Sequence, residues 1–301
     1  MEVPVVTVST DKTKAAAAER VTDLVAVTAL DVRYRNGTHA LKAVSLSVGR
    51  GERVALVGES GSGKSTLAMA IAGFLRQDDV DAVDGTVAFE GEAIEPAQSG
   101  MLPRRTPGIS VVFQDAMTSL DPVWTVGSQL TSIIRTTEGC RRRAAHDRAL
   151  DWLRRVGLTD FDRVLGARPY ELSGGMRQRV MIALALASKP RLLIADEPTS
   201  ALDASLARAT MDLLVELADE TGVSLLMVTH DLELCMRYVD QVAVMYQGEI
   251  VEAGRTADIS TNAQHPYTKG LLYCVPTLAN AQGEYLPTLA TFMSTQEEVA
   301  S

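Results

Sequence analysis

Residues 58–65 read Gly-Glu-Ser-Gly-Ser-Gly-Lys-Ser and directly follow a short apolar run, Arg-Val-Ala-Leu-Val, at residues 53–57. The eight residues fit the pattern G-x-x-x-x-G-K-[ST], in which a glycine-rich turn joins a buried strand to a helix. Glycines let the backbone adopt positive φ angles and approach a bound group closely. Successive N–H groups then form a nest for anions, and the following helix adds its positive end. The stretch therefore predicts a phosphate-binding loop.

The side chains of this loop extend the prediction to a nucleoside triphosphate and its metal ion. Lys64 places a positive charge between the β- and γ-phosphates, and Ser65 offers a hydroxyl to Mg²⁺. The candidate nucleotide-binding residues here are Gly58, Ser60, Gly61, Ser62, Gly63, Lys64, Ser65 and Thr66.

A second apolar run, residues 192–195, ends at Asp196 and Glu197. A strand-end aspartate holds the Mg²⁺ shell in proteins with a phosphate-binding loop of this kind. Glu197 is placed to accept a proton from the attacking water or to orient that water. The alternative for this segment alone is a pair of solvated acids at a strand end.

Two further polar residues follow apolar runs. His230 comes after residues 225–229, and Gln114 ends the run 109–113. At a strand end near the nucleotide, His230 can reach the γ-phosphate or orient Glu197, and Gln114 can contact Mg²⁺ or the attacking water. The alternatives are a structural histidine and a surface amide.

The pattern of apolar residues outward from the loop predicts an α/β core. Alternation over residues 25–34 and 44–48 predicts antiparallel strands with one buried face. Strands that alternate with helices favour a mainly parallel sheet. Buried strands are expected at 53–57, 109–113, 192–195, 224–229 and 242–246. Helices are expected at 64–75 and 206–217, and a helical insert at about 115–187. Residues 1–23 are expected to form a mobile tail, and residues 255–301 to have weak structure.

Composition excludes several classes of protein. The chain has 301 residues, 46% hydrophobic, with a net charge of −9, which argues against sequence-independent nucleic-acid binding. The basic run at residues 141–143 is interpreted as a solvated helix face. No segment has the length of a membrane span or of a signal core. Cys140, Cys235 and Cys274 lie far apart, which fits a reducing compartment and predicts neither a disulfide framework nor a metal site.

Residues 172–179, Leu-Ser-Gly-Gly-Met-Arg-Gln-Arg, together with the loop and Asp196-Glu197, resemble the signature motif of ATP-binding-cassette (ABC) ATPases. The resemblance covers about residues 24–275. It implies a P-loop NTPase fold, a RecA-like α/β core with an antiparallel β subdomain and a helical subdomain at about 115–187. The ATPase domain would span 24–254, after the tail and before a short C-terminal extension at 255–301.

The resemblance also implies a head-to-tail dimer of two cassettes with two ATP molecules between them. Ser173, Gly174 and Gly175 would contact the γ-phosphate held by the partner's loop; the alternative is an N-capped helix. Tyr34 resembles the aromatic residue that stacks on adenine, with a strand-face tyrosine as the alternative. Residues 200–203, which end at Asp203, resemble the loop through which the cassettes communicate.

Two stretches are similar to one subfamily, the oligopeptide, dipeptide and nickel importers. They are the Gln-loop region at residues 113–122 and the start of the C-terminal extension at residues 265–272. Ala116 and Asp121 stand where that subfamily usually has Pro and Asn. A cysteine cluster is missing, so no iron–sulfur centre is expected. The shorter form is more like nickel or metallophore importers.

The expected function is the ATP-hydrolysing motor of an importer of peptides, nickel or a metal chelate. The resemblance implies a second, distinct cassette as partner, two transmembrane permease subunits, an extracytoplasmic binding protein and a peripheral position on the cytoplasmic face of the membrane. Nucleic acid is not an expected partner. The alternative is a soluble ABC ATPase that acts in DNA repair or translation. A regulator that binds nucleotide without turnover would lack Glu197 or His230, and both are present.

Overall fold

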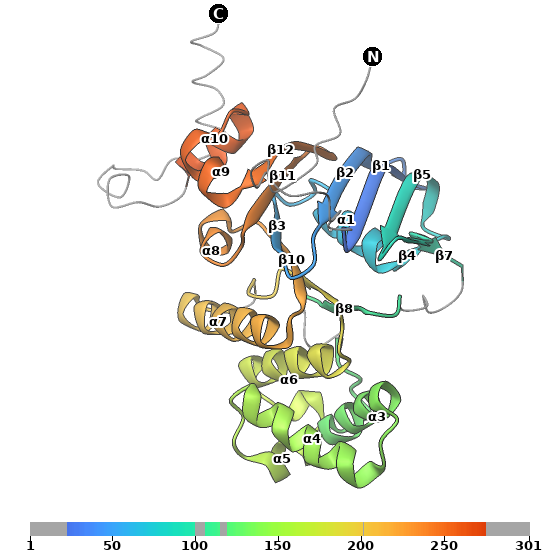
Figure 1. Ribbon diagram of the computed structural model, residues 1–301, viewed down its shortest axis with the longest axis vertical. Coiled ribbons are helices and arrows are strands. Elements are labelled where there is room, and N and C mark those ends of the chain that lie inside the picture. Colours follow the sequence, from blue (N-terminus) through green and yellow to red (C-terminus); the bar gives the residue numbers. More distant parts are fainter. Residues whose placement is uncertain (1–22, 100–105, 115–118, 201, 275–301) are drawn as a thin grey trace, which may run out of the picture. The chain divides into compact units, whose positions relative to one another are not determined.

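The computed structural model describes residues 23–99, 106–114, 119–200 and 202–274. The chain divides into two compact units, Met1–Arg104 with Val228–Ser301, and Arg105–Met227. Figure 1 colours the chain from the blue strands of the first unit, through the green and yellow helices of the second, to the orange and red elements that return to the first. The expected tail at residues 1–23 lies outside the described residues, apart from Asp23.

An antiparallel sheet in the first unit has, among the described residues, four strands in the order β2-β1-β5-β6. They are β1 (Val25–Tyr34), β2 (His39–Val48), β5 (Val80–Phe89) and β6 (Glu92–Ile94). Val25, Val27, Leu30 and Val32 of β1 are buried, which confirms the predicted one-sided strand. The step from Val27 to Leu30 breaks the period of two because the register shifts there, in a bulge with Ala29 at a φ of 47°.

The phosphate-binding loop of the first unit lies between β3 (Arg53–Val57) and α1 (Lys64–Ala72). β3 pairs in parallel with β11 (Gln241–Tyr246), which pairs antiparallel with β12 (Glu249–Arg255). The expected helix at 64–75 is too long. It ends at Ala72 because Gly73, with a φ of 73°, caps it, and Phe74 N–H bonds back to the Met69 carbonyl.

After α1 the chain pairs two short strands in parallel, β4 (Leu75–Arg76) and β7 (Ala97–Gln98).

The segment after β12 corrects the expectation of weak structure. It forms α9 (Thr256–Asn262) and α10 (Pro266–Tyr273), and a short helix, α8 (Leu232–Met236), precedes β11. Pro266 begins α10, and Tyr267 is fully buried. Packing of a buried face stabilises a helix whose local sequence gives little signal. Residues 275–301 lie outside the described residues.

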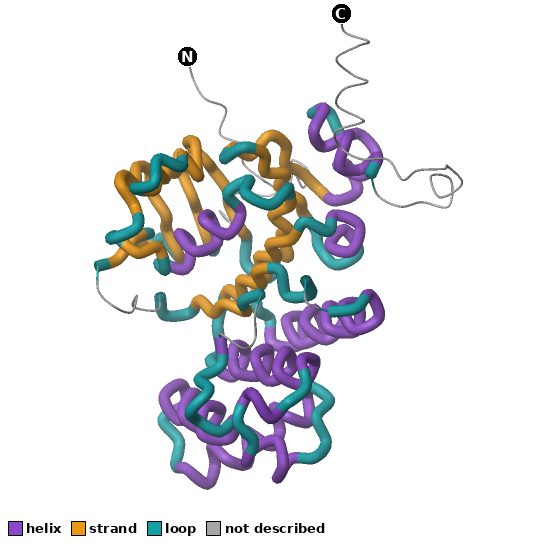
Figure 2. Tube along the Cα trace, turned by 180° about the vertical axis from the view of Figure 1, so that it is seen from behind, coloured by secondary structure: helices purple, strands orange, loops and turns teal. Residues whose placement is uncertain are grey.

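The second unit combines a parallel strand pair with helices, which Figure 2 shows in orange and purple. β8 (Ile109–Val112) pairs with β9 (Leu192–Asp196), and β10 (Ser224–Thr229) spans the division between the units. The helical elements are α3 (Val126–Glu138), α4 (Arg142–Arg155), α5 (Phe161–Gly166), the 3₁₀ turn η1 (Pro169–Glu171), α6 (Gly174–Ala187) and α7 (Ala204–Thr221). The strands and helices expected in this unit are therefore present.

α6 is the central helix of the second unit. Residues 180–187 are all buried, as expected for a helix that is apolar on every side. It packs against α3, α4, α7 and β8. In the described part of the chain, no helix combines the length and apolarity that a membrane crossing requires. The domain boundaries expected from the sequence stay predictions.

Candidate functional site

Most candidate residues of the first unit lie in the loop between β3 and α1 or in the first turn of α1. Gly63 is the N-cap of α1 and has a φ of 104°. A Cβ atom at this position would lie 2.4 Å from the carbonyl oxygen of Ala40. A glycine is therefore required at position 63, both because φ is positive and because β2 leaves no room for a Cβ atom. From the other side, Gly248 N–H donates a 3.0 Å hydrogen bond to the Ser62 carbonyl.

Lys64 is the one cationic side chain among the loop candidates, and only 4% of it is exposed. Its Nζ donates hydrogen bonds to the carbonyls of Gly58 (2.8 Å) and Glu59 (2.7 Å). A buried ammonium group needs such partners. The loop thus holds the Lys64 ammonium group beside the loop backbone. From this position the ammonium can reach a phosphate group bound in the loop. Ser62 and Gly58 are also buried, whereas Ser60, Gly61 and Ser65 are exposed and Thr66 is half-buried.

Tyr34 and His230 complete the candidates of this unit. The Tyr34 hydroxyl, at the end of β1, lies 3.1 Å from Thr66 Oγ1, so the structure brings this tyrosine to the first turn of α1. His230 is exposed and follows β10. Asp231 then caps α8 by accepting from Leu234 N–H at 2.8 Å. Stacking of Tyr34 on adenine and the contact of His230 with phosphate stay predictions.

In the second unit, the acidic pair lies where β9 ends. Asp196 is buried, and Glu197 has a φ of 46°, which is unusual for a residue other than glycine. Strained backbone of this kind is concentrated at functional sites. The next residue, Pro198, accepts a 2.7 Å hydrogen bond from the Gln178 side chain of α6. The turn that carries Glu197 is therefore held by the helix behind it.

Gln114 comes two residues after β8, which runs parallel to β9 with Val112 opposite Ala195. The carboxyl ends of the two strands meet at one sheet edge, so the structure brings Gln114 and Asp196 to the same edge of this strand pair. Carboxylate and amide oxygens are hard donors, the chemistry that suits Mg²⁺, so the two residues at this edge fit the ion. In the first unit, the exposed Ser65 hydroxyl is a donor of the same kind. Among the described residues, no group of three or more His, Cys, Asp or Glu side chains could by itself hold a metal.

Ser173 and Asp203 both cap helices. Ser173 Oγ accepts from Met176 N–H at 3.3 Å at the start of α6, and Asp203 Oδ1 accepts from Leu206 N–H at 3.0 Å at the start of α7. Ser173 therefore does cap a helix, as the alternative interpretation of this residue predicted. The cap is compatible with a contact to phosphate, because the N–H groups of Gly174 and Gly175 lie at the positive end of α6. That contact stays a prediction.

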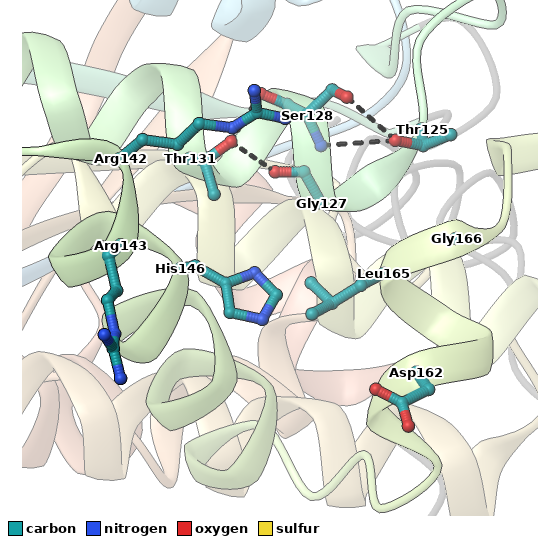
Figure 3. A pocket seen from close by; sticks show the side chains of 10 residues that line it. All are labelled: Thr125, Gly127, Ser128, Thr131, Arg142, Arg143, His146, Asp162, Leu165 and Gly166. Atoms are coloured by element: carbon teal, nitrogen blue, oxygen red, sulfur yellow. Dashed lines mark hydrogen bonds between the residues drawn. The ribbon is translucent and has the colours of Figure 1, made fainter.

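A hollow of about 660 Å³ lies among α3, α4 and α5, away from the residues predicted for the site. Figure 3 shows Arg142 reaching toward Ser128, His146 facing Leu165, and Arg143 pointing away from the other side chains. Arg142, Arg143 and His146 are exposed, which agrees with the solvated helix face expected for this basic run.

Two residues that contact the loop have no counterpart in the sequence prediction. They are Gly248, which bonds Ser62, and Tyr267, whose hydroxyl accepts a 2.8 Å hydrogen bond from Glu59 N–H. Both are more than 180 residues from the loop, so no local pattern could have placed them there. The resemblance of residues 265–272 to a known C-terminal extension is the one signal that pointed to the segment of Tyr267.

Comparison with known families gives two matches. The family described as "ABC transporter" matches residues 41–200. The family described as "Oligopeptide/dipeptide transporter, C-terminal region" matches residues 251–300.

Curated relatives resemble the chain over most of its length. It is 42% identical over 260 residues to the oligopeptide transport ATP-binding protein AmiE of Streptococcus pneumoniae, covering 86% of this chain and 73% of AmiE. It is 42% identical over 244 residues to the probable D,D-dipeptide transport ATP-binding protein DdpD of Escherichia coli, covering 81% and 74%. It is 39% identical over 274 residues to the oligopeptide transport ATP-binding protein OppD of Bacillus subtilis, covering 90% and 76%.

Solved structures agree with these relatives. CbiO1 of Clostridium perfringens, part of the ABC transporter complex cbiONQ, superposes with a TM-score of 0.66 at 28% identity, covering 80% of this chain and 91% of CbiO1. The ATP-binding cassette MJ0796, solved as a post-hydrolysis dimer bound to ADP and Pi, gives a TM-score of 0.65 at 29% identity, covering 77% of this chain and 98% of that one.

Proposed function

Because the chain belongs to the ABC transporter family of ATPases, we propose that it is the ATP-binding and ATP-hydrolysing subunit of an importer of peptides. The observation that carries the transport assignment is the match of residues 251–300 to the oligopeptide/dipeptide transporter C-terminal region. Relatives at 39–42% identity are named for oligopeptide or dipeptide transport. These names favour transport over a soluble role in DNA repair or translation.

ATP binds, in this proposal, at the loop between β3 and α1. Lys64 meets the β- and γ-phosphates, the loop N–H groups surround them, and Tyr34 stacks on adenine. Ser65, Gln114 and Asp196 would hold Mg²⁺, and the ion would neutralise charge on the phosphates. Glu197 takes the proton of the attacking water as general base, and His230 stabilises the γ-phosphate by hydrogen bonding.

Closure needs a second cassette in this proposal. Ser173, Gly174 and Gly175 face the nucleotide held by the partner's loop, and the loop that ends at Asp203 passes the state of one site to the other. The partner is a distinct paralogue. Support comes from the start of α6, whose free N–H groups suit an anion, and from the dimeric state of MJ0796.

The permease contact is proposed at an exposed apolar patch of the second unit. Val123, Trp124 and Tyr170 are 72%, 60% and 55% exposed. Arg168 Nε donates a 3.2 Å hydrogen bond to the Val123 carbonyl and so joins the two loops that carry the patch. Large exposed apolar side chains gathered together are typical of protein interfaces. Two permease subunits would hold the ATPase at the cytoplasmic face of the membrane.

The patch is tested by replacing Val123 and Trp124 with serine in one variant. We expect loss of co-purification with the permeases and unchanged ATP binding by the free chain. Tyr273→Ser, which removes another exposed aromatic residue in the other unit, is the matched control. Full retention of the permeases by the double variant would contradict the patch.

The transport function is tested in vesicles that contain the permeases, both cassettes and the extracytoplasmic binding protein. We expect ATP-dependent uptake of labelled peptides. Uptake of Ni²⁺ or of a nickel chelate without peptide uptake would show that the proposed substrate is wrong and that the importer function is right. Association with RNA or ribosomes instead of permeases would favour the soluble alternative.

A further inference from the structure

A tyrosine of the C-terminal region is hydrogen-bonded to the phosphate-binding loop. The Tyr267 hydroxyl accepts the N–H of Glu59 at 2.8 Å, although the two residues are 208 positions apart. Tyr267 is fully buried, and its ring centroid lies 4.2 Å from that of Tyr246 on β11. The loop therefore has a fixed contact in a segment beyond the match to the ABC transporter family at residues 41–200.

This hydrogen bond and the bond to Lys64 are made by the same peptide group. The carbonyl of Gly58 and the N–H of Glu59 belong to one planar unit and point in opposite directions. Lys64 Nζ donates to that carbonyl at 2.8 Å, while Tyr267 holds the N–H at the other end. Rotation of the peptide plane would break both bonds. The tyrosine hydroxyl thus fixes the direction of one of the two carbonyls that hold the ammonium, the other being the carbonyl of Glu59 at 2.7 Å.

The position of Tyr267 is itself fixed from β12. The carboxylate of Glu252 accepts the N–H groups of Gln264 (2.6 Å) and His265 (3.0 Å) just before α10. The His265 ring then accepts the N–H of Tyr267 at 3.2 Å. Burial raises the pKa of the Tyr267 phenol, so its hydroxyl stays protonated at neutral pH.

We propose that Tyr267 is a positioning residue for ATP binding, which sets the Gly58–Glu59 peptide plane and thereby the ammonium of Lys64. The inference rests on the proposed role of the loop in binding ATP and adds a task for the C-terminal region. This region thus contributes to the nucleotide site of its own chain.

The test compares Tyr267→Phe with Tyr246→Phe in the full chain. The first variant removes the hydroxyl that holds Glu59. The second is the matched control, because the Tyr246 hydroxyl accepts from the exposed Gln247 side chain and has no bond to the loop. Isothermal titration measures Mg·ATP affinity, and competition against a fluorescent ATP analogue measures AMP affinity. AMP lacks the phosphates that Lys64 meets.

We expect Tyr267→Phe to weaken ATP binding about threefold to tenfold, the scale of one lost hydrogen bond in a partly hydrated loop. AMP affinity should change less than twofold, and Tyr246→Phe should bind ATP like the wild type.

Two results would overturn the inference while leaving the ATP site in place. They are unchanged ATP affinity in Tyr267→Phe and an equal loss for ATP and AMP in that variant. A wild-type chain that fails to bind Mg·ATP would instead overturn the proposed function of the loop itself.

Discussion

The side-chain amide of Gln178 on α6 donates a 2.7 Å hydrogen bond to the carbonyl of Pro198, the residue after Glu197. Gln178 is buried, so the bond is made away from solvent, where a lost partner is costly. The helix that Ser173 caps is thereby joined to the turn that carries the candidate general base. Within this unit, α6 therefore holds the turn that carries Glu197.

Replacement of Gln178 by leucine should slow ATP hydrolysis and destabilise the chain. The carbonyl of Pro198 loses its partner, at a cost of about 1–3 kcal/mol for a buried polar group. Denaturant unfolding measures that cost, and steady-state hydrolysis in the assembled complex measures the rate. Gln77→Leu, at an exposed position in the first unit, is the control. Equal hydrolysis in the variant and the wild type would contradict the link.

Glu197→Gln should slow hydrolysis by about 10²–10⁴-fold, the usual contribution of a general base. ATP binding should persist, because the amide keeps the size of the side chain and the loop of the other unit is unchanged. Phosphate release from the purified assembly is the measurement, with the exposed Glu216→Gln on α7 as control. Turnover at the wild-type rate would show that another group acts as base.

The sequence predicts those parts of this protein that depend on neighbouring residues. The loop at 58–65 and the strand end at Asp196 were found because the spacing of apolar residues marks each strand and the polar residue after it. β5 was missed because Asp81, Asp84 and Gly85 interrupt its apolar pattern. α10 was missed because its stability comes from burial of Tyr267 and Gly270 rather than from a strong helical period.

The remaining features of the site depend on tertiary contacts. The positive φ of Glu197 follows from the turn after β9, and a glutamate in the sequence does not predict a positive φ. The Tyr267–Glu59 bond joins segments that are distant in the chain. Such pairs become visible only when the fold is known.

Gly63→Ala should abolish or strongly weaken ATP binding. The added Cβ would lie 2.4 Å from the Ala40 carbonyl oxygen at a φ of 104°, so the loop has to move away from β2. We expect at least a tenfold loss of Mg·ATP affinity by titration, since several phosphate contacts depend on this backbone. Gly51→Ala is the matched control: its φ is 68° but nothing lies within 4 Å of its Cβ position. Both variants carry backbone strain, and only the first should lose the nucleotide.

Ser173→Arg should disable the nucleotide site of the partner cassette. The arginine would fill the space in front of Gly174 and Gly175 and remove the cap of α6, which by itself costs about 1 kcal/mol. Hydrolysis is measured in a complex whose other site has been silenced, with the exposed Ser132→Arg on α3 as control. Wild-type hydrolysis at the partner's site would contradict the proposed contact across the dimer.

Glu252→Gln should destabilise the first unit in a pH-dependent way. Burial acts to raise the pKa of Glu252, but hydrogen bonds, including those from the Gln264 and His265 N–H groups, outweigh it and hold the pKa below its ordinary value of 4.5. A carboxylate with a lowered pKa in the folded state stabilises that state above its ordinary pKa. This stability is lost as the pH falls through the folded-state pKa.

The variant should therefore unfold more easily than the wild type at pH 7, by about 1.5–3 kcal/mol, the scale of a hydrogen bond to a charged group. The difference should shrink below pH 4.5 as the wild-type carboxylate becomes protonated. Denaturant unfolding at pH 7 and at a series of lower values measures it, with Glu249→Gln, an exposed carboxylate on the same strand, as control. A difference that stays constant down to pH 3 would mean that the charge of Glu252 does not hold the start of α10.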